Sequence, residues 1–468
     1  MQNSIFQFWY WEIQDVEDYQ VTIKNNIYAS FKKINVYLYS MKKIEIHNFR
    51  CFENLELELN PGINLLIGDN ASGKTTILKA LRAAMSSFFA GYSDENTRFI
   101  GLSESDFTVK VTNSLVETDK PIIVDFDLEG ISAILRRNTQ KEKRTLTKPL
   151  KPISTYAKEL QVTLFDNGIQ TKALPLFASF STEDIHSSRK FAFGLFKEYA
   201  NKPSFGYFEC LQGDGFFPYW IKRLLVLKEG EKGKFEISCV KQAIRKSLGA
   251  NGCNIINKME IRVNQRKVYY HFIDGREIDA YNLSDGYTRL VNMVTDLAFR
   301  CALLNQGIYK EEACLKTEGT VLIDEIDLHL HPTLQSVVIK GLQQAFPKLQ
   351  FIITTHAPMV MTSVQSNEEN IVYKLSYSKE KGYEALPVNL YGMDASTILD
   401  VELDTTPRSK EVDDRLKTLF DLIDIDEYVK AAEKLNEMRS EFGDQLPELA
   451  KAQAMLNFLS DSEDDSNS

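Results

Sequence analysis

The chain has 468 residues, of which 43% are hydrophobic and 26% are charged, and its formal net charge is −10. This composition is typical of a globular protein with room for two or three domains, and the negative charge disfavours a protein that coats nucleic acid by charge alone. Six scattered cysteines without a CxxC pair, and the lack of an apolar run of about 18 residues, predict reduced thiols, a cytoplasmic location and no membrane partner.

Residues 1–40 hold many aromatic side chains but show little clean periodicity. Met41 then opens the stretch MKKIEIHNF, which reads like the first strand of a domain. Two interpretations stay open. Residues 1–40 are either an extension upstream of a natural start at Met41 or an aromatic arm that contacts a partner.

Hydrophobic patterns after residue 40 predict several strands. The stretches KIEIHNF (43–49) and LELEL (55–59) alternate with period two, as half-buried strands do. Three continuously apolar stretches predict strands that are buried on both faces. They are INLLI (63–67), TVLI (320–323) and FII (351–353).

The rest of the sequence shows mostly helical patterns. Residues 185–258 look mainly helical, strand alternation returns at 259–273, and the chain reads as helices after residue 400. We expect the acidic tail 460–468 to be disordered. No heptad pattern is sustained over three or four repeats, so a long coiled coil is not expected.

The first buried strand runs directly into GDNASGKTT, which fits the P-loop spacing. Glycines let backbone N–H groups turn toward phosphate oxygens, and the helix that follows adds the positive end of its dipole. We expect Lys74 to reach the β- and γ-phosphates of ATP, and the Thr75 hydroxyl to ligate Mg²⁺. The candidate nucleotide-binding residues are Gly68, Asp69, Asn70, Ala71, Ser72, Gly73, Lys74, Thr75 and Thr76.

The second buried strand ends in two adjacent carboxylates, Asp324 and Glu325. Unpaired carboxylates are costly to bury, but beside Mg²⁺ and ATP both gain a role. We expect Asp324 to hold the metal and Glu325 to polarise the attacking water as the general base.

The third buried strand ends in TTHAP, which places His356 at a strand end as well. If these strands are parallel, Gly68, Asp324 and His356 converge at the carboxyl ends of the sheet, and His356 is a candidate catalytic residue that contacts the γ-phosphate. His329 and His331 follow the second strand. They are either a metal-binding pair or part of a turn that contacts a neighbouring subunit.

The stretch NLSDGYTRL (282–290) predicts the start of a helix, because Ser284 is a natural N-cap and apolar residues follow at helical spacing. Gly286 would let a phosphate approach the first turn. Ser284, Asp285 and Gly286 therefore form a candidate anion site. A plain capped helix is the alternative.

Together, the P-loop, LSDG, LIDE and the late histidine resemble the head of ABC-type ATPases. Within that superfamily, IHNFRCFENLEL and Asn70 are similar to the SMC, RecF and OLD branch rather than to transporters. The resemblance implies an α/β head with a mixed-sheet core, an antiparallel β-subdomain, a helical insertion and a C-terminal helical region. It also implies that ATP lies between the P-loop of one subunit and the Ser284 signature of a second copy, in a two-fold head-to-head dimer that can assemble further.

More specifically, LPLFASF, LSDGYTRLVNMVTDLAFRCALLN, LIDEIDLHLHPTLQ and residues 394–424 are similar to the PtuA family, the ATPase subunits of Septu anti-phage systems. Similar ATPases accompany some retrons, and the likeness covers about residues 41–440. It implies a PtuB-like HNH nuclease as partner and DNA as the target of the complex. Two departures stand out: Tyr287 occupies a position where many signatures have Gln or Glu, and the glutamine loop is indistinct, with 177–182 as its candidate.

The expected organisation has six parts. They are an extension or arm (1–40), ATPase lobe I with the P-loop and β-subdomain (41–184), a helical insertion (185–258), ATPase lobe II with the signature and catalytic residues (259–399), a C-terminal helical region that is a candidate partner-binding part (400–459), and the acidic tail (460–468).

Other functions stay open. An OLD-like ATPase would carry its own nuclease domain after His356, where Asp424 and Asp426 form the only Asp-x-Asp. An SMC- or RecF-like repair ATPase is disfavoured by the missing coiled-coil arm, and a transporter motor by the missing transmembrane half. The basic segment LRRNTQKEKRTLTKPLKP (135–152) predicts a solvated hairpin tip or, alternatively, a contact with DNA.

Overall fold

A computed structural model gives the fold and describes residues 40–93, 98–112, 115–117, 120–142, 144–182, 202–213, 216–231, 233–399, 409–443 and 446–466. The chain divides into two compact units, which are described separately. The head unit is Met1–Gly392 and the C-terminal unit is Met393–Ser468.

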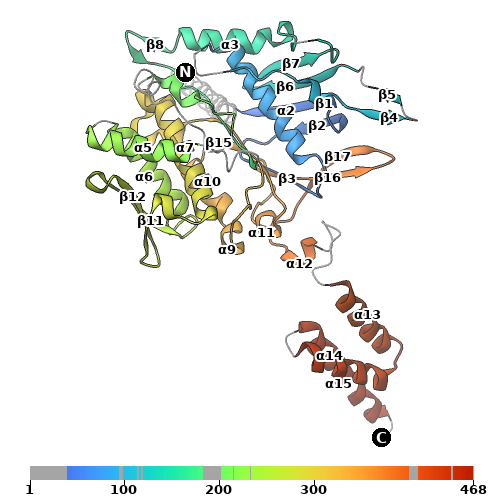
Figure 1. Ribbon diagram of the computed structural model, residues 1–468. Coiled ribbons are helices and arrows are strands. Elements are labelled where there is room, and N and C mark those ends of the chain that lie inside the picture. Colours follow the sequence, from blue (N-terminus) through green and yellow to red (C-terminus); the bar gives the residue numbers. More distant parts are fainter. Residues whose placement is uncertain are drawn as a thin grey trace, which may run out of the picture. The chain divides into compact units, whose positions relative to one another are not determined.

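The head unit begins with an antiparallel sheet in which four strands follow the order β2-β1-β6-β7 (Figure 1). The strands are β1 (Met41–Phe49), β2 (Phe52–Glu58), β6 (Ile122–Leu128) and β7 (Ile131–Arg137). In β6 the residues alternate between buried and half-buried, which is the pattern of a strand in a sheet with one covered face.

A second, mixed sheet forms the centre of the head unit, with the strand order β10-β14-β15-β3-β16-β17. The strands are β3 (Ile63–Gly68), β10 (Leu176–Phe180), β14 (Gly319–Ile323), β15 (Leu349–Thr354), β16 (Ile371–Ser378) and β17 (Gly382–Val388). All neighbours pair in parallel except β17, which runs antiparallel at the edge. Every residue of β3, β14 and β15 is buried, because both faces of these strands are covered.

Helix α2 (Lys74–Ser86) lies between the two sheets, since it contacts β1 and β6 on one side and β3 and β15 on the other (Figure 1). The long helix α7 (Asp285–Tyr309) packs against β10 and against a helical layer. That layer contains α5 (Phe217–Glu229), α6 (Lys234–Leu248) and α10 (Val338–Ala345).

Smaller elements complete the head unit. A three-stranded antiparallel sheet is formed by β11 (Ile256–Arg262), β12 (Lys267–Phe272) and β13 (Glu277–Asp279). Two short hairpins are β4 (Lys110–Thr112) with β5 (Leu115–Glu117), and β8 (Phe165–Asp166) with β9 (Ile169–Gln170). Among the described residues, further helices are α3 (Lys151–Val162), α8 (Ala313–Lys316), α9 (Pro332–Gln335) and α11 (Pro358–Met361).

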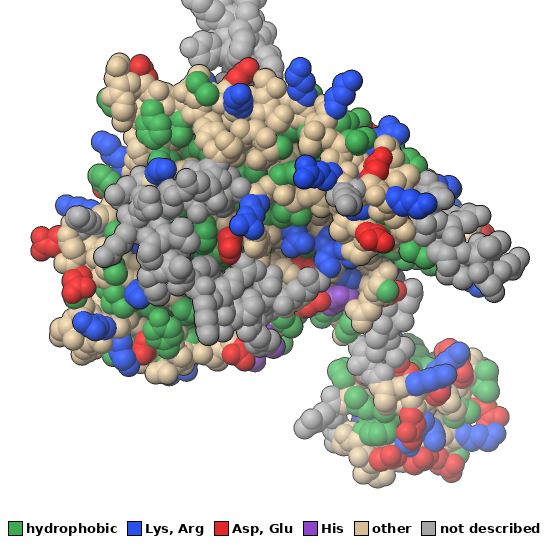
Figure 2. Space-filling view, turned by 45° about the horizontal axis from the view of Figure 1, so that its top comes forward, with side chains coloured by type: hydrophobic (Ala, Val, Ile, Leu, Met, Phe, Trp, Pro, Cys, Tyr) green, Lys and Arg blue, Asp and Glu red, His purple; other side chains and the backbone are tan. Residues whose placement is uncertain are grey.

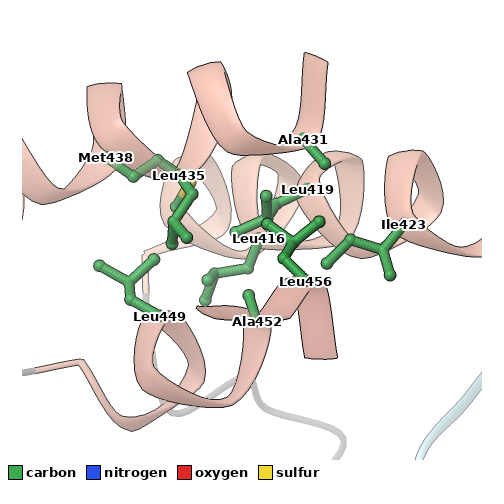
Figure 3. Packing of buried hydrophobic residues seen from close by; sticks show 9 residues of the cluster. All are labelled: Leu416, Leu419, Ile423, Ala431, Leu435, Met438, Leu449, Ala452 and Leu456. Carbon is green, nitrogen blue, oxygen red and sulfur yellow. The ribbon is translucent and has the colours of Figure 1, made fainter. Parts of the chain in front are cut away.

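The C-terminal unit is helical and has a core of its own. After the short α12 (Ala395–Thr397) come α13 (Lys410–Asp424), α14 (Tyr428–Phe442) and α15 (Pro447–Ser466). Nine apolar side chains from the three long helices point toward one another in Figure 3, among them Leu419, Leu435 and Ala452. Burial of this apolar cluster stabilises the packing of the three helices against one another.

The structure confirms the predicted fold class and the three buried strands. The stretch 259–273, where strand alternation was predicted, lies in two strands joined by a turn. One expectation needs correction, because α15 continues to Ser466, into the tail that we expected to be disordered. Extending a formed helix requires no new nucleus, which favours helix in that acidic segment. Residues 1–39 and the helical text at 188–200 lie outside the described residues.

Candidate functional site

The P-loop follows β3 and depends on two glycines with positive φ. Gly68 has φ +137° and Gly73 has φ +95°. A Cβ at Gly68 would lie 2.3 Å from the Leu375 carbonyl oxygen, and one at Gly73 would lie 2.3 Å from the Phe52 ring. The loop therefore needs glycine at both positions, for the backbone conformation and for the space.

Lys74 is the cation of this loop. Its Nζ donates hydrogen bonds to the carbonyl oxygens of Gly68 (2.7 Å) and Asp69 (2.8 Å). Burial lowers the pKa of Lys74 to about 8, although nearby carboxylates, Asp69 and Asp324 first among them, act in the opposite direction. A phosphate placed here would give this buried ammonium a charged partner.

Thr75 and Asp324 come together where α2 begins and β14 ends. The Thr75 hydroxyl lies 3.2 Å from Asp324 Oδ2, and the Thr354 hydroxyl donates to Asp324 Oδ1 at 2.6 Å. Asp324 is only 4% exposed, and the side-chain hydrogen bonds that it accepts come from these uncharged hydroxyls. A buried carboxylate beside a hydroxyl offers the hard oxygen ligands that Mg²⁺ prefers, so the residues fit this metal.

Glu325 follows in a conformation that is rare for a side-chain-bearing residue, with φ +49°. Its main chain is held from two directions. The Glu325 N–H donates to the Thr354 hydroxyl at 2.8 Å, and the Glu325 carbonyl accepts from Arg289 at 2.5 Å. Backbone strain of this kind is found where the surroundings impose a functional geometry.

His356 lies just after β15, and Asp327 anchors its loop. Asp327 Oδ1 accepts hydrogen bonds from the Thr355 hydroxyl (2.5 Å) and from the His356 N–H (3.4 Å). Burial lowers the pKa of His356, and the positive charge of Lys74 lowers it further. The imidazole is therefore neutral at pH 7 and can donate one hydrogen bond to a phosphate oxygen.

The parallel pairing required for convergence is present. Ile323 of β14 pairs with Ile353 of β15, which pairs with Leu65 of β3, so these strands end at the same edge of the sheet. The pKa of His356 responds to Lys74 and to the carboxylates of Asp327, Glu325 and Asp324, in accord with this placement.

A cavity of about 500 Å³ lies at the β1–β2 turn of the head unit. It is lined by the β1–β2 turn, by Thr108 and Val109, and by the β16–β17 hairpin. Cys51 connects the cavity to α2, because its thiol is within hydrogen-bonding reach of the Thr76 side chain. Tyr377 and Tyr383 give the cavity an aromatic side, with their rings 4.8 Å apart.

The signature stretch begins α7, and Ser284 occupies the N-cap position. This confirms the predicted helix start, but the Ser284 side chain makes no capping hydrogen bond, so the exposed hydroxyl is unused within the helix. Asp285 is exposed as well. Gly286 is buried, and a Cβ there would lie 2.3 Å from the His329 carbonyl oxygen. Close packing inside the chain is therefore a reason for glycine that the sequence did not indicate.

Residues 177–182, the candidate for the glutamine loop, include the end of β10. Ser179, Phe180 and Ser181 line a small pocket together with Thr75 and Asp324. The segment thus lies beside the expected metal ligands, but it contributes hydroxyl groups there and contains no glutamine.

His329 and His331 are both exposed, and His331 Nδ1 accepts a hydrogen bond from the Thr333 N–H as the N-cap of α9. Within the described part of the chain, three or more potential ligands gather only at Glu260, His271 and Glu277. The metal-pair interpretation of His329 and His331 thus has no third ligand among the described residues.

The basic segment 135–152 does not act as one surface. Arg137 is buried and donates to the carbonyl oxygens of Leu102 (2.9 Å) and Gln140 (3.0 Å), so its charge is structural. Lys143 lies outside the described residues. The exposed cations are Arg136, Lys141, Arg144, Lys148 and Lys151.

Asp424 and Asp426, the pair that an OLD-like nuclease would need, lie at the end of α13. Asp426 has φ +62° and accepts a hydrogen bond from the Tyr428 hydroxyl at 2.6 Å, so it shapes the turn into α14. Between His356 and the C-terminal unit, the described residues contain one helix and the two strands β16 and β17.

Three residues of the site were missed from the sequence. Arg289, Thr354 and Asp327 hold the main chain or side chains of Asp324, Glu325 and the His356 loop. Of these three residues, only Thr354 could have been identified from the sequence. It precedes the strand-end residue His356 by two positions and lies on β15, next to β14. Arg289 and Asp327 act through contacts that sequence spacing does not predict.

Two family models match the head unit. Residues 43–212 match the family described as an AAA domain, and residues 226–361 match one described as an AAA ATPase domain. Among solved structures, the Smc head bound to the C-winged helix domain of ScpA is 15% identical, with 75% of this chain and 98% of that chain covered and a TM-score of 0.43.

The P-loop after β3, the carboxylate pair after β14 and the two family matches define this chain as a P-loop ATPase, and its motifs resemble those of the SMC, RecF and OLD ATPases. The chain is similar to the retron Vc95 probable ATPase of Vibrio cholerae, with 25% identity over 85% of each chain. It is also similar to the Septu protein PtuA of Bacillus mycoides, with 25% identity over 81% of this chain and 47% of that protein.

Within the described residues, no helix is both long and apolar enough to cross a membrane.

Proposed function

We propose that this chain is the ATP-hydrolysing subunit of an anti-phage defence complex and controls a partner HNH nuclease of the PtuB type. One observation carries the ATPase part: Thr75 and Asp324 meet within hydrogen-bonding distance at the P-loop, and Glu325 follows on the same turn. The similarity to PtuA and to a retron ATPase supports the defence role.

Each residue has a distinct task in this proposal. Lys74 binds the β- and γ-phosphates of ATP and stabilises the negative charge that develops during transfer. Glu325 accepts a proton from the attacking water, and neutral His356 donates a hydrogen bond to the γ-phosphate. Mg²⁺ bound by Thr75 and Asp324 would neutralise phosphate charge. The aromatic cavity beside Thr76 has room for the nucleoside.

The signature acts in a second copy of the chain. Ser284 is exposed, its hydroxyl is unused within the helix, and the 25-residue helix behind it directs a positive dipole end outward. A γ-phosphate held by the neighbouring P-loop would satisfy this site. One P-loop and one signature in each chain then give two equivalent sites in a two-fold dimer.

Complementation between variants tests the shared site. A Lys74→Ala chain cannot hold ATP, and a Ser284→Arg chain spoils the site of its neighbour, so each alone should be inactive. After random subunit exchange, half of the dimers are mixed and each has one intact site, which predicts about a quarter of wild-type turnover if the sites are independent. Exchange is first verified with two differently tagged chains.

The C-terminal unit is the proposed docking part for the nuclease. Residues 393–468 carry 20 acidic and 8 basic residues, a net charge of −12, although the whole chain carries only −10. Acidic and basic side chains lie among hydrophobic ones on its visible face in Figure 2. Such a unit suits a partner with a basic surface, as expected of a nuclease that binds DNA. The exposed cations of segment 135–152 are proposed to contact DNA in the complex.

Purification of the native complex tests the proposal. The chain should co-purify with an HNH nuclease, and DNA cleavage by the complex should change when ATP is added. Glu325→Gln should alter the effect of ATP on DNA cleavage, because this variant binds ATP but does not hydrolyse it. A complex without a nuclease, or one whose cleavage ignores both ATP and Glu325→Gln, would contradict the regulatory role.

A further inference from the structure

The start of the signature helix is fixed to the turn that carries the catalytic carboxylates of the same chain. Gly286, in the first turn of α7, packs so closely that a Cβ would lie 2.3 Å from the His329 carbonyl oxygen. His329 itself has φ +62°. The turn after β14 and the first turn of α7 therefore have little freedom to move independently.

Arg289, one turn further along α7, makes a second connection to the same region. It is 4% exposed, and its guanidinium donates to the carbonyl oxygens of Glu325 (2.5 Å) and Asp324 (2.6 Å). These two bonds use the planar fork of arginine, which can address two neighbouring acceptors at once.

These contacts hold the main chain of Glu325 in an unfavourable conformation. A left-handed φ of +49° is unfavourable for a residue with a Cβ and persists only when the surroundings impose it. Thr354 holds the Glu325 N–H from the side of β15, and Arg289 holds the Glu325 carbonyl from the side of α7. The direction of the catalytic carboxylate thus depends on where the signature helix begins.

We infer that Arg289 is a positioning residue for hydrolysis: it fixes the main chain of Glu325 so that the carboxylate faces the attacking water. Arg289 lies on the helix that begins with Ser284. When Ser284 contacts the ATP bound by the neighbouring chain, this helix therefore also fixes the orientation of Glu325, which acts on the ATP bound by its own chain. This inference rests on the proposed function, in which Glu325 is the general base.

The first test compares two buried arginines of the same kind. Arg289→Met should leave ATP affinity within about threefold of wild type and lower turnover about tenfold, the effect of about 1.4 kcal/mol in the barrier. Arg137→Met is the matched control, since Arg137 is also buried and also donates to two carbonyl oxygens, but in the antiparallel sheet. The control should lose stability without losing turnover per folded molecule.

Arg289→Lys provides a milder variant in case the methionine variant does not fold. Lysine keeps a charge and several donors but lacks the planar fork, so turnover should lie between those of wild type and Arg289→Met. Thermal unfolding of each variant shows how much protein is folded in the assay.

A double-mutant cycle with Glu325→Gln separates positioning from general damage. If Arg289 acts through Glu325, adding Arg289→Met to Glu325→Gln should lower single-turnover hydrolysis by less than about twofold. A full tenfold further loss in the double variant would overturn the inference, as would normal turnover in folded Arg289→Met. The proposed function would fail differently, since Glu325→Gln alone would then hydrolyse ATP at the wild-type rate.

Discussion

The charge state of Lys74 makes ATP binding depend on pH in a direction that the structure defines. Burial lowers the pKa of Lys74 from 10.5 to about 8 in the empty site. Phosphate oxygens favour the charged ammonium, so bound ATP raises this pKa again. Binding therefore takes up a proton when the pH lies above about 8, and affinity falls as the pH rises.

The magnitude follows from the fraction of Lys74 that is protonated before binding. With a pKa near 8, about nine tenths of the empty sites carry the charge at pH 7 and about one tenth at pH 9. If only the charged form binds ATP well, the apparent Kd increases about tenfold between these two values. Over the same range Mg-ATP keeps an almost constant charge.

The assay is equilibrium binding of Mg-ATP to Glu325→Gln, in which hydrolysis does not consume the ligand. Titration in buffers of different ionisation enthalpy measures the proton uptake directly. Lys74→Met is the control, because its weak residual binding should not vary with pH. An affinity that stays constant from pH 7 to pH 9 without proton uptake would refute the assigned role of Lys74.

Three further variants probe separate parts of the account. Glu325→Gln should lower hydrolysis by at least about 10²-fold, as loss of a general base does, while Mg-ATP binding measured by fluorescence is retained; normal turnover would show that another residue activates the water. Gly286→Ala places a Cβ 2.3 Å from the His329 carbonyl oxygen. This variant should lose ATP turnover but keep ATP binding, and hydrolysis at the wild-type rate would contradict this expectation. Leu419→Ala removes a fully buried side chain and should destabilise the C-terminal unit by about 2–5 kcal/mol in denaturant titrations of the full chain. The exposed Val429→Ala serves as its control, and equal stability of the two would exclude the packed core.

Local sequence patterns predicted the parts of the site that depend on local chemistry. The strands β3, β14 and β15 were predictable because a strand that is buried on both faces must be continuously apolar. The P-loop was predictable because its glycines are required by backbone conformation, and the positive φ values of Gly68 and Gly73 agree with that reason. Placement of Asp324 and His356 at one edge then needed only parallel pairing, which the structure provides.

Contacts between distant segments were not predictable in this way. Arg289 lies 35 and 36 residues from the two carbonyl oxygens that it holds, and nothing in its spacing on α7 indicates that role. The hydrogen bonding of the Ser284 side chain was not predictable either. The sequence indicated a side chain that caps the helix. A capping preference is a local tendency, and here the hydroxyl stays unused although the residue occupies the N-cap position.

The central claim, that each ATP lies between two copies of the chain, is tested most directly by crosslinking. One chain carries Ser284→Cys, a second carries Ala71→Cys in the P-loop, and both carry Glu325→Gln so that ATP persists. Of the native cysteines, five are buried and Cys51 is half-buried, so chains without the added cysteines give the background. If each ATP lies between two copies, a crosslink between the two different chains should form only with Mg-ATP. A chain that carries both added cysteines and crosslinks only within itself, with no product between chains, would contradict the shared site.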